Sequence, residues 1–276
     1  RQAIRKDARF APAYRSAGKL ALHQGELVAA RDFLARAMEF DTSDSALAIQ
    51  LADLTYQLYF GNPGRPAALL REVESIAVRL QEKWPNKPDG YRIQAQVLIE
   101  RHRPEEAVTL LERASAKIPA NESLKTQAAS ALFRLGRDAD AEALLQDVMD
   151  RFPNYTAAYD LYYLRLMQRN ASGEARQLLE SKWENTGEPD AALQLAAHDD
   201  AFGNRDSARR VLDDLARNSA AGDLLLARIG DFWMHRGQWE DARLCYDEGS
   251  RREPAHATEY ISRRAEWYLA QKKTAD

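Results

Sequence analysis

Apolar and small residues recur along the chain with the spacing of amphipathic helices, and the pattern repeats every 33 or 34 residues. One series consists of alanines: Ala107, Ala141, Ala175, Ala208 and Ala242, with Ala30 at the same place further upstream. A second series runs five residues ahead of the first: Gly25, His102, Gly136, Asn170, Gly203 and Gly237. Repetition at this period predicts an all-α array of stacked helix–turn–helix repeats.

The two series have different physical causes. The second series marks the turn between the helices of a repeat, where the chain needs a residue with positive φ. Glycine adopts that conformation freely, and asparagine and histidine tolerate it better than most residues. The alanines fall within the second helix, where a larger side chain would push neighbouring helices apart. Prolines are expected to follow the ends of second helices. They are Pro85, Pro119, Pro153 and Pro254, and one repeat has Gly187 in the equivalent place.

Seven complete repeats are expected, followed by a capping helix. Residues 1–10 are interpreted as the C-terminal half of a truncated repeat, and residues 257–276 as a capping helix and tail. The second repeat is nine residues too long, and its surplus around residues 57–66 predicts a turn-rich segment after an extended first helix. The complete repeats span 11–44, 45–87, 88–121, 122–155, 156–188, 189–222 and 223–256.

The two ends of the array are predicted to differ. In the capping helix, Arg263 and Arg264 stand where another repeat has Ile229 and Gly230. Arginines are tolerated on a face that stays in water, so this helix is expected to keep the downstream end soluble. No such helix precedes the first repeat, so an apolar end face and end-to-end self-association through it are expected there. The apolar positions of the capping helix are predicted to form one stripe: Tyr260, Ile261, Trp267 and Leu269.

The repeat at 223–256 carries the family pattern most fully, at Leu226, Ile229, Gly230, Trp233, Gly237, Trp239, Ala242, Tyr246 and Pro254. On these residues the chain resembles the tetratricopeptide repeat family, and the resemblance covers essentially its whole length. It implies a right-handed α-solenoid whose concave wall is built from first helices and receives a peptide or protein partner. Because the family is defined by packing residues, the resemblance implies little about activity.

The side chains expected to line that groove are first-helix positions that packing leaves free. The upstream wall is more basic and the downstream wall more acidic and apolar, which fits an extended or helical peptide held by several weak contacts. Ile93 is also expected to face the groove. The candidate partner-binding residues are Arg15, Lys19, His23, Gln50, Asp53, Tyr56, Arg92, Gln96, Gln127, Phe133, Arg134, Met167, Arg228, Asp231, Met234 and His235.

One specific mode of binding is disfavoured by the same resemblance. Some members of the family hold the acidic C-terminal tails of chaperones in a clamp of basic and asparagine side chains on three first helices. The clamp positions correspond here to Arg15, Lys19, Gln50, Asp89 and Ile93. The last two lack the positive charge that would hold a carboxylate, so binding of such tails is not expected.

Composition excludes some partners and leaves the compartment open. The chain has 39 basic and 42 acidic residues, a net charge of −3, so we expect no nucleic-acid partner, which would need a concentrated basic face. No apolar run approaches the length of a membrane span, so direct membrane insertion is not expected. The single cysteine, Cys245, permits no internal disulfide, and a cytoplasmic or a periplasmic, envelope-associated location both fit.

Candidate chemistry is sparse. His198, Asp199 and Asp200 are the cluster most suggestive of a metal, but consecutive helical residues diverge by about 100° and cannot converge on one ion. Asp199 occupies a place that holds leucine or tryptophan in other repeats, so we expect it to find an arginine partner. The sequence contains no nucleophile elbow, dinucleotide fingerprint or zinc-binding histidine pair. We therefore expect no catalytic residues, metal or cofactor.

Three functions remain open at this point. The leading hypothesis is a non-enzymatic protein–protein interaction scaffold that binds a peptide or protein partner in the groove. The alternative is the binding arm of a larger bacterial envelope protein of exopolysaccharide export or secretion, or of an enzyme whose catalytic part is absent here. A third hypothesis is sugar binding in the groove through Tyr56 and Phe133. The segment 57–66 is a second candidate contact site, because insertions in repeat arrays often carry specificity.

Overall fold

The computed structural model describes residue 7 and residues 9–119, 121–218 and 224–275, and the fold of these residues is all-α, without a strand among them. The chain divides into two compact units, residues 1–161 (unit 1) and residues 162–276 (unit 2). The division falls within α10, and each unit is described by itself. None of the helices described is both long and apolar enough to span a bilayer.

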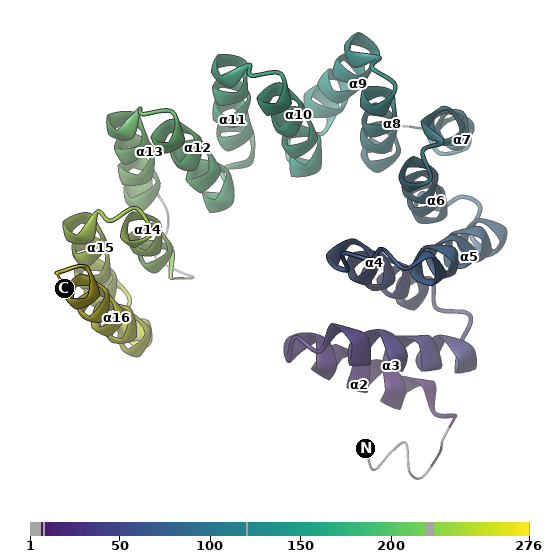
Figure 1. The fold of residues 1–276 in the computed structure, drawn as a ribbon, viewed down its shortest axis with the longest axis horizontal. Helices are drawn as coiled ribbons and strands as arrows, with labels where there is room; N and C mark the ends of the chain where they lie inside the picture. The colour runs from purple at the N-terminus through teal and green to yellow at the C-terminus, as the bar shows by residue number, and fades with distance from the viewer. Residues whose placement is uncertain (1–6, 8, 120, 219–223, 276) are drawn as a thin grey trace. The chain divides into compact units, whose positions relative to one another are not determined.

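Unit 1 consists of helices that pack in antiparallel pairs along the chain (Figure 1). In each pair the even-numbered helix is the first helix of a repeat and the odd-numbered helix is the second. The helices are α2 (Ala11–His23), α3 (Leu27–Phe40), α4 (Ser45–Gly61), α5 (Ala67–Lys83), α6 (Asp89–Glu100), α7 (Pro104–Lys117), α8 (Glu122–Arg134) and α9 (Asp138–Arg151), followed by α10 (Thr156–Gln168), which crosses into unit 2.

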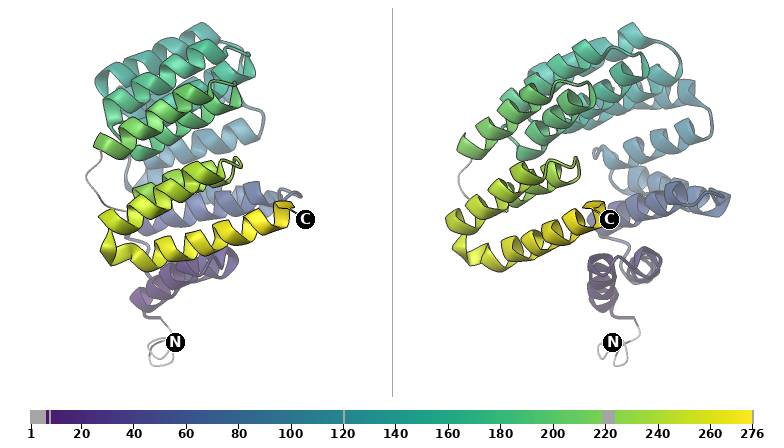
Figure 2. Two further views of the ribbon diagram at one scale, coloured as in Figure 1. Left: turned by 90° about the vertical axis from the view of Figure 1, so that its left-hand side faces the viewer. Right: turned by 60° about the vertical axis from the view of Figure 1, so that its left-hand side comes forward.

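Unit 2 continues the same pattern. Helix α12 packs on α11 and α13, α14 packs on α15, and α16 packs on both α15 and α14. Two further views show α14, α15 and α16 lying side by side (Figure 2). The helices are α11 (Ser172–Thr186), α12 (Pro189–Ala201), α13 (Arg205–Asn218), α14 (Leu225–Met234), α15 (Trp239–Arg252) and α16 (Ala257–Ala275), with a 3₁₀ turn at Pro254–His256.

The predicted turn residues all adopt the left-handed backbone conformation. Their φ angles are 74° at Gly25, 57° at His102, 71° at Gly136, 57° at Asn170, 81° at Gly203 and 70° at Gly237. After each of them, the next N–H donates to the carbonyl five residues back, as from Glu26 to Ala21 at 2.9 Å. This bond satisfies a carbonyl that the end of the first helix leaves open. The prediction of positive φ at these positions is confirmed.

The alanine series is completely buried. Each of its six members has an exposed fraction of 0%: Ala30, Ala107, Ala141, Ala175, Ala208 and Ala242. The second helices end as the proline series predicts, since α5, α7, α9 and α15 each end two residues before a proline. Helix α11 instead ends at Thr186, and the next residue, Gly187, is left-handed with φ 63°. Small side chains at fixed places therefore let neighbouring helices approach closely.

The insertion in the second repeat is more helical than predicted. Gln57 to Gly61 belong to α4, and only residues 62–66 lie outside the helices, so the expectation of a turn-rich segment from residue 57 is wrong. The surplus residues mainly lengthen the pair, because α4 and α5 each have 17 residues. The short connection is closed by Asn62, whose side chain accepts a bond from the N–H of Gly64 at 2.9 Å.

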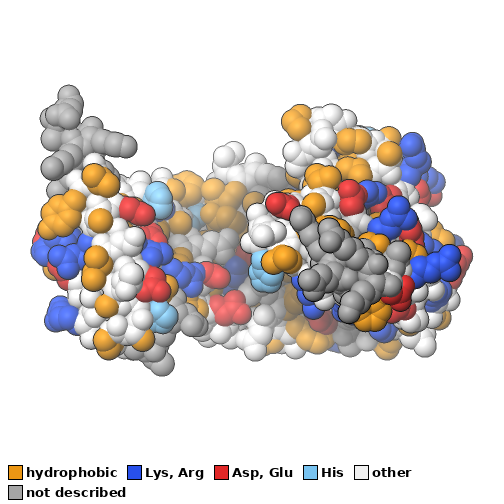
Figure 3. Space-filling model, turned by 90° about the horizontal axis from the view of Figure 1, so that it is seen from below, with side chains coloured by type: hydrophobic (Ala, Val, Ile, Leu, Met, Phe, Trp, Pro, Cys, Tyr) orange, Lys and Arg blue, Asp and Glu red, His pale blue; other side chains and the backbone are white. Residues whose placement is uncertain are grey.

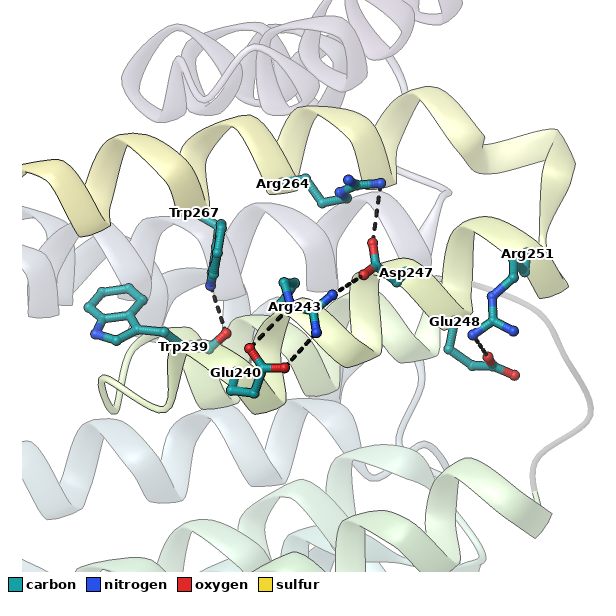
Figure 4. Close-up of polar contacts among 8 residues, drawn as sticks. All are labelled: Trp239, Glu240, Arg243, Asp247, Glu248, Arg251, Arg264 and Trp267. Atoms are coloured by element: carbon teal, nitrogen blue, oxygen red, sulfur yellow. Dashed lines mark hydrogen bonds and ion pairs between the residues drawn. The ribbon is translucent and has the colours of Figure 1, made fainter.

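The arginine pair of α16 was predicted to face water, and this prediction is wrong. Arg263 forms an ion pair with Asp231 of α14 at 3.0 Å, and Arg264 forms one with Asp247 of α15 at 3.1 Å. Figure 4 shows Arg264 and Arg243 both directed at Asp247. Both arginines of α16 are half-buried, and they help to hold that helix on its neighbours.

The predicted apolar stripe of α16 divides between two faces. Tyr260 and Trp267 are buried, with exposed fractions of 0% and 6%. The indole N–H of Trp267 donates to the carbonyl of Trp239 at 2.6 Å (Figure 4). Ile261 and Leu269 are 59% and 63% exposed on the outer face, so their prediction as part of the packed stripe is wrong.

Candidate functional site

The first helices of unit 1 border two adjoining depressions, which together are called the unit 1 groove. One has a volume of about 640 Å³ and the other about 510 Å³, and Asp53 borders both. The first is lined mainly by Arg15, Lys19, Leu22, Ile49, Gln50, Asp53 and Gln57. The second is lined by Asp53, Arg92, Ser123, Thr126, Gln127, Ser130, Tyr155, Ala157 and Leu161.

The groove gathers six of the sixteen side chains named from the sequence. They come from α2, α4, α6 and α8, because the first helices pack on one side of the unit and present their remaining faces there. These residues are Arg15, Lys19, Gln50, Asp53, Arg92 and Gln127.

Three polar groove residues escaped the sequence reasoning: Ser123, Ser130 and Tyr155. Ser123 and Ser130 lie four residues before and three residues after Gln127. Residues at these spacings share one face of a helix, so the predicted position of Gln127 already contained the signal. Tyr155 immediately precedes α10 and could not be placed from helical periodicity.

Charges in the groove are largely paired, and much of its remaining polar surface is neutral. Arg92 forms an ion pair with Asp53 at 3.1 Å, and Arg15 forms one with Asp44. Lys19 is exposed at the α2 end. Between these charges the polar part of the lining consists mainly of amides and hydroxyls, which can both donate and accept hydrogen bonds: Gln50, Gln57, Gln127, Ser123, Ser130 and Tyr155.

Tyr56 and Gln96 belong to a separate cluster near the end of α4. The hydroxyl of Tyr56 donates to Glu100 at 3.3 Å and also contacts the side chain of Gln96. Burial, reinforced by the nearby Glu100 carboxylate, raises the pKa of Tyr56 to about 12. Arg65 completes the cluster, with its guanidinium 4.7 Å from the ring centroid of Phe60 and 3.0 Å from Glu100. The lengthened helix thus presents an aromatic and cationic surface.

Four other residues expected in unit 1 lie elsewhere. His23 ends α2, and Phe133 and Arg134 are the last two residues of α8; these three border neither depression. Ile93 is only 1% exposed, so its expected position in the groove is wrong: it packs in the core.

The residues predicted in unit 2 are mostly occupied by contacts within that unit. Asp231 accepts hydrogen bonds from the hydroxyl of Tyr246 at 2.8 Å and from Arg263 at 3.0 Å. Its carbonyl lies 2.7 Å from the imidazole of His235, and Met234 lies 3.7 Å from the hydroxyl of Tyr246. Burial, with the Asp231 carboxylate, raises the pKa of Tyr246. Asp231 therefore fastens α15 and α16 to α14.

The other two candidates of unit 2 are also partly covered. Arg228 of α14 forms an ion pair with Asp190 of α12. Met167 of α10 is half-buried. Neither residue borders a depression of the unit 1 groove.

The cluster of His198, Asp199 and Asp200 turns its side chains to three separate partners. Asp199 is completely buried and receives two hydrogen bonds from Arg176, at 2.7 and 3.2 Å, which confirms the expected arginine partner. His198 lies 3.2 Å from the hydroxyl of Tyr163, and burial lowers its pKa. Asp200 accepts from Arg236 at 2.8 Å. The three side chains thus form contacts between helices of unit 2.

Comparison with known proteins agrees with this architecture. A family model described as tetratricopeptide repeat matches residues 98–162. The chain has the fold of a tetratricopeptide repeat (TPR) protein. None of the curated protein sequences matches it.

Solved structures similar to this chain share its fold at low sequence identity. TTC0263, a thermophilic TPR protein of Thermus thermophilus, is 18% identical with a TM-score of 0.53, over 68% of this chain and 98% of that one. Yeast Tom70 is 13% identical with a TM-score of 0.61, over 98% of this chain and 57% of that one. PilW, a type IV pilus biogenesis factor, is 16% identical with a TM-score of 0.50, over 75% and 93%.

Proposed function

We propose that the TPR protein is a non-enzymatic scaffold that binds a peptide segment of a partner protein in the unit 1 groove. The observation that carries the proposal is the meeting of polar side chains from α2, α4, α6 and α8 around two adjoining depressions. The packing between helices uses the alanine and glycine positions, so the side chains of Lys19, Gln50 and Gln127 remain at the groove surface, where a ligand can reach them.

The lining favours an extended peptide. Successive residues of such a peptide lie about 3.3 Å apart, and each presents a backbone N–H and a backbone C=O. The amides of Gln50 and Gln127 can form hydrogen bonds with both groups. Leu22 and Ile49 provide apolar contact at the α2 end. Lys19, which is exposed at the same end, favours an acidic side chain there.

Sugar binding has less support. A sugar ring stacks on the open face of an aromatic side chain, but Tyr56 is half-buried, with its ring centroid 6.1 Å from that of Tyr59 and 6.2 Å from that of Phe60. Phe133 is also half-buried and does not border the groove.

A role as the binding arm of a larger envelope or secretion protein is the alternative. The likeness to PilW, named as a pilus biogenesis factor, is compatible with it, but at 16% identity this likeness extends to the fold alone. The groove would act in the same way in either setting.

The proposal is tested by selecting peptides from a displayed library on the TPR protein and measuring their affinities by calorimetry. We expect Lys19→Glu and Gln127→Ala each to weaken binding about tenfold, because each removes about 1.4 kcal/mol of contact. Lys117→Glu and Gln146→Ala are matched controls at exposed positions of second helices, and they should leave affinity unchanged. Selection of no peptide, or weakening by the controls alone, would exclude the groove as the binding site.

A further inference from the structure

The first helix of the lengthened pair in unit 1 continues for one turn more than the first helices on either side of it. Helix α4 has 17 residues, whereas α2 has 13 and α6 has 12. His23 ends α2 and Glu100 ends α6 at the repeat position that Gln57 occupies in α4, so residues 58–61 form the extra turn. This turn lies between repeats that the structure describes, unlike the truncated repeat expected for residues 1–10, which falls largely outside the described residues.

Phe60 lies on this extra turn and is 55% exposed. It follows Asp53 by seven residues and Gln57 by three, so the three side chains share one face of α4. Asp53 and Gln57 border the unit 1 groove. Phe60 is therefore placed just beyond the groove on the same face, although it borders neither depression itself. Core packing does not explain so large an apolar side chain at this position.

The ring of Phe60 is held in place by its neighbours. The guanidinium of Arg65 lies 4.7 Å from its centroid, and the ring of Tyr56 lies 6.2 Å from it. Glu100 of α6 fastens both neighbours, because it accepts hydrogen bonds from Arg65 at 3.0 Å and from the hydroxyl of Tyr56 at 3.3 Å. The side chain of Glu100 is only 9% exposed, so these bonds are shielded from water. A ring that is already fixed loses little freedom when a ligand covers it.

Arg65 reaches the ring through an uncommon backbone conformation. Its φ is 38°, in the left-handed region that few residues other than glycine adopt. Such a conformation persists only where the surrounding contacts hold it, and residues of this kind gather at functional sites. Here the holding contacts are those with Phe60 and Glu100. The short connection of residues 62–66 thus keeps a guanidinium against the ring.

The charges around Phe60 are paired, which indicates what kind of side chain can cover the ring. Arg65 is paired with Glu100, and Arg101, at the same end of α6, donates two hydrogen bonds to Glu74 at 2.9 and 2.6 Å. On the face of the molecule in Figure 3, basic and acidic side chains are likewise interspersed among hydrophobic ones. A charged ligand group gains little beside paired charges. A second aromatic ring would bury the exposed part of Phe60, and aromatic pairs attract each other beyond the burial of their surface.

We propose that an aromatic side chain of the partner peptide stacks on Phe60, next to the segment of the peptide that lies in the unit 1 groove. This inference rests on the proposed function, because one peptide occupies both places. Phe60 lies about 4.5 Å along α4 from Gln57, and an extended peptide advances about 3.3 Å per residue. The aromatic residue is therefore expected within about two positions of the peptide residue that contacts Gln57. The lengthened pair would select among peptides that the groove can hold.

Calorimetry with peptides selected from a displayed library on the wild-type protein tests this proposal. The selected peptides should share a Phe, Tyr or Trp, and replacing it by alanine should weaken binding about five- to tenfold. Phe60→Ser should weaken binding of the original peptide by the same factor. It should not weaken binding of the alanine peptide further, because the contact is then already missing. Phe202→Ser, at a phenylalanine of unit 2 that is 47% exposed, is the matched control and should bind like wild type.

Several results would overturn the proposal. Selected peptides without an aromatic residue, or losses that simply add when both partners are changed, would show that no ring stacks on Phe60. A leucine that binds as well as the aromatic residue would also contradict stacking. In these cases the groove proposal stands if Lys19→Glu and Gln127→Ala still weaken binding, whereas selection of no peptide at all would refute both proposals. Circular dichroism verifies that Phe60→Ser keeps its helical content, and a misfolded variant would be replaced by Phe60→Gln in the same cycle.

Discussion

Replacing Arg176 by methionine is expected to lower the free energy of unfolding of the protein by about 3–5 kcal/mol. Asp199 is completely buried and its carboxylate receives two hydrogen bonds from Arg176. Methionine fills similar space but donates nothing, so the variant leaves a buried carboxylate without its charge partner. Urea unfolding followed by circular dichroism measures the loss.

A second substitution should reverse most of that loss. Other repeats hold Leu98, Leu132 and Leu166 at the position of Asp199, and two apolar side chains there need no ion pair. The double variant Arg176→Met with Asp199→Leu is therefore expected to recover close to wild-type stability. A single variant that loses less than about 1 kcal/mol, or a double variant no more stable than the single one, would contradict this account of the pair.

Replacing Gly230 by alanine is expected to destabilise unit 2 by about 1–3 kcal/mol. A methyl group at Gly230 would lie 2.3 Å from a ring carbon of Tyr246, which is far inside contact distance. The ring cannot easily move, because Tyr246 is 0% exposed and its hydroxyl is bonded to Asp231. Thermal unfolding should therefore shift to lower temperature.

Gly173 provides a control of the opposite sign. It lies in α11, and a methyl group added there would meet no atom within 4 Å. Gly173→Ala should raise stability by about 0.5–1 kcal/mol, because alanine loses less backbone entropy in a helix. If both substitutions changed stability equally, close packing at Gly230 would not explain its glycine.

Features set by local chemistry could be predicted from the sequence. The turns depend on one residue that accepts positive φ, so glycine, asparagine and histidine at a fixed spacing were enough to place them. The alanines recur because the second helix of each repeat lies close to its neighbours at the same position, where only a small side chain fits. The ends of the second helices could be predicted from the prolines that follow them, because proline cannot continue a helix.

Features set by distant partners could not be predicted in the same way. The environment of Arg263 depends on Asp231, 32 residues away, which no single repeat reveals. Helical periodicity placed Gln127 in the groove, but it did not distinguish the exposed side of α6 from the side on which Ile93 is buried. In unit 2, Asp231 was predicted to face the groove because the repeat pattern does not use its position for packing. In the structure its carboxylate accepts hydrogen bonds from α15 and α16.

The central claim is that a partner peptide lies against the first helices of unit 1. The most direct measurement places a photoreactive amino acid at Gln127, and in a second protein at the exposed Gln146 of α9, and irradiates each with a selected peptide. Mass spectrometry should find the peptide joined at position 127 and not at position 146. Crosslinking at position 146, or equal crosslinking at both positions, would contradict the claim.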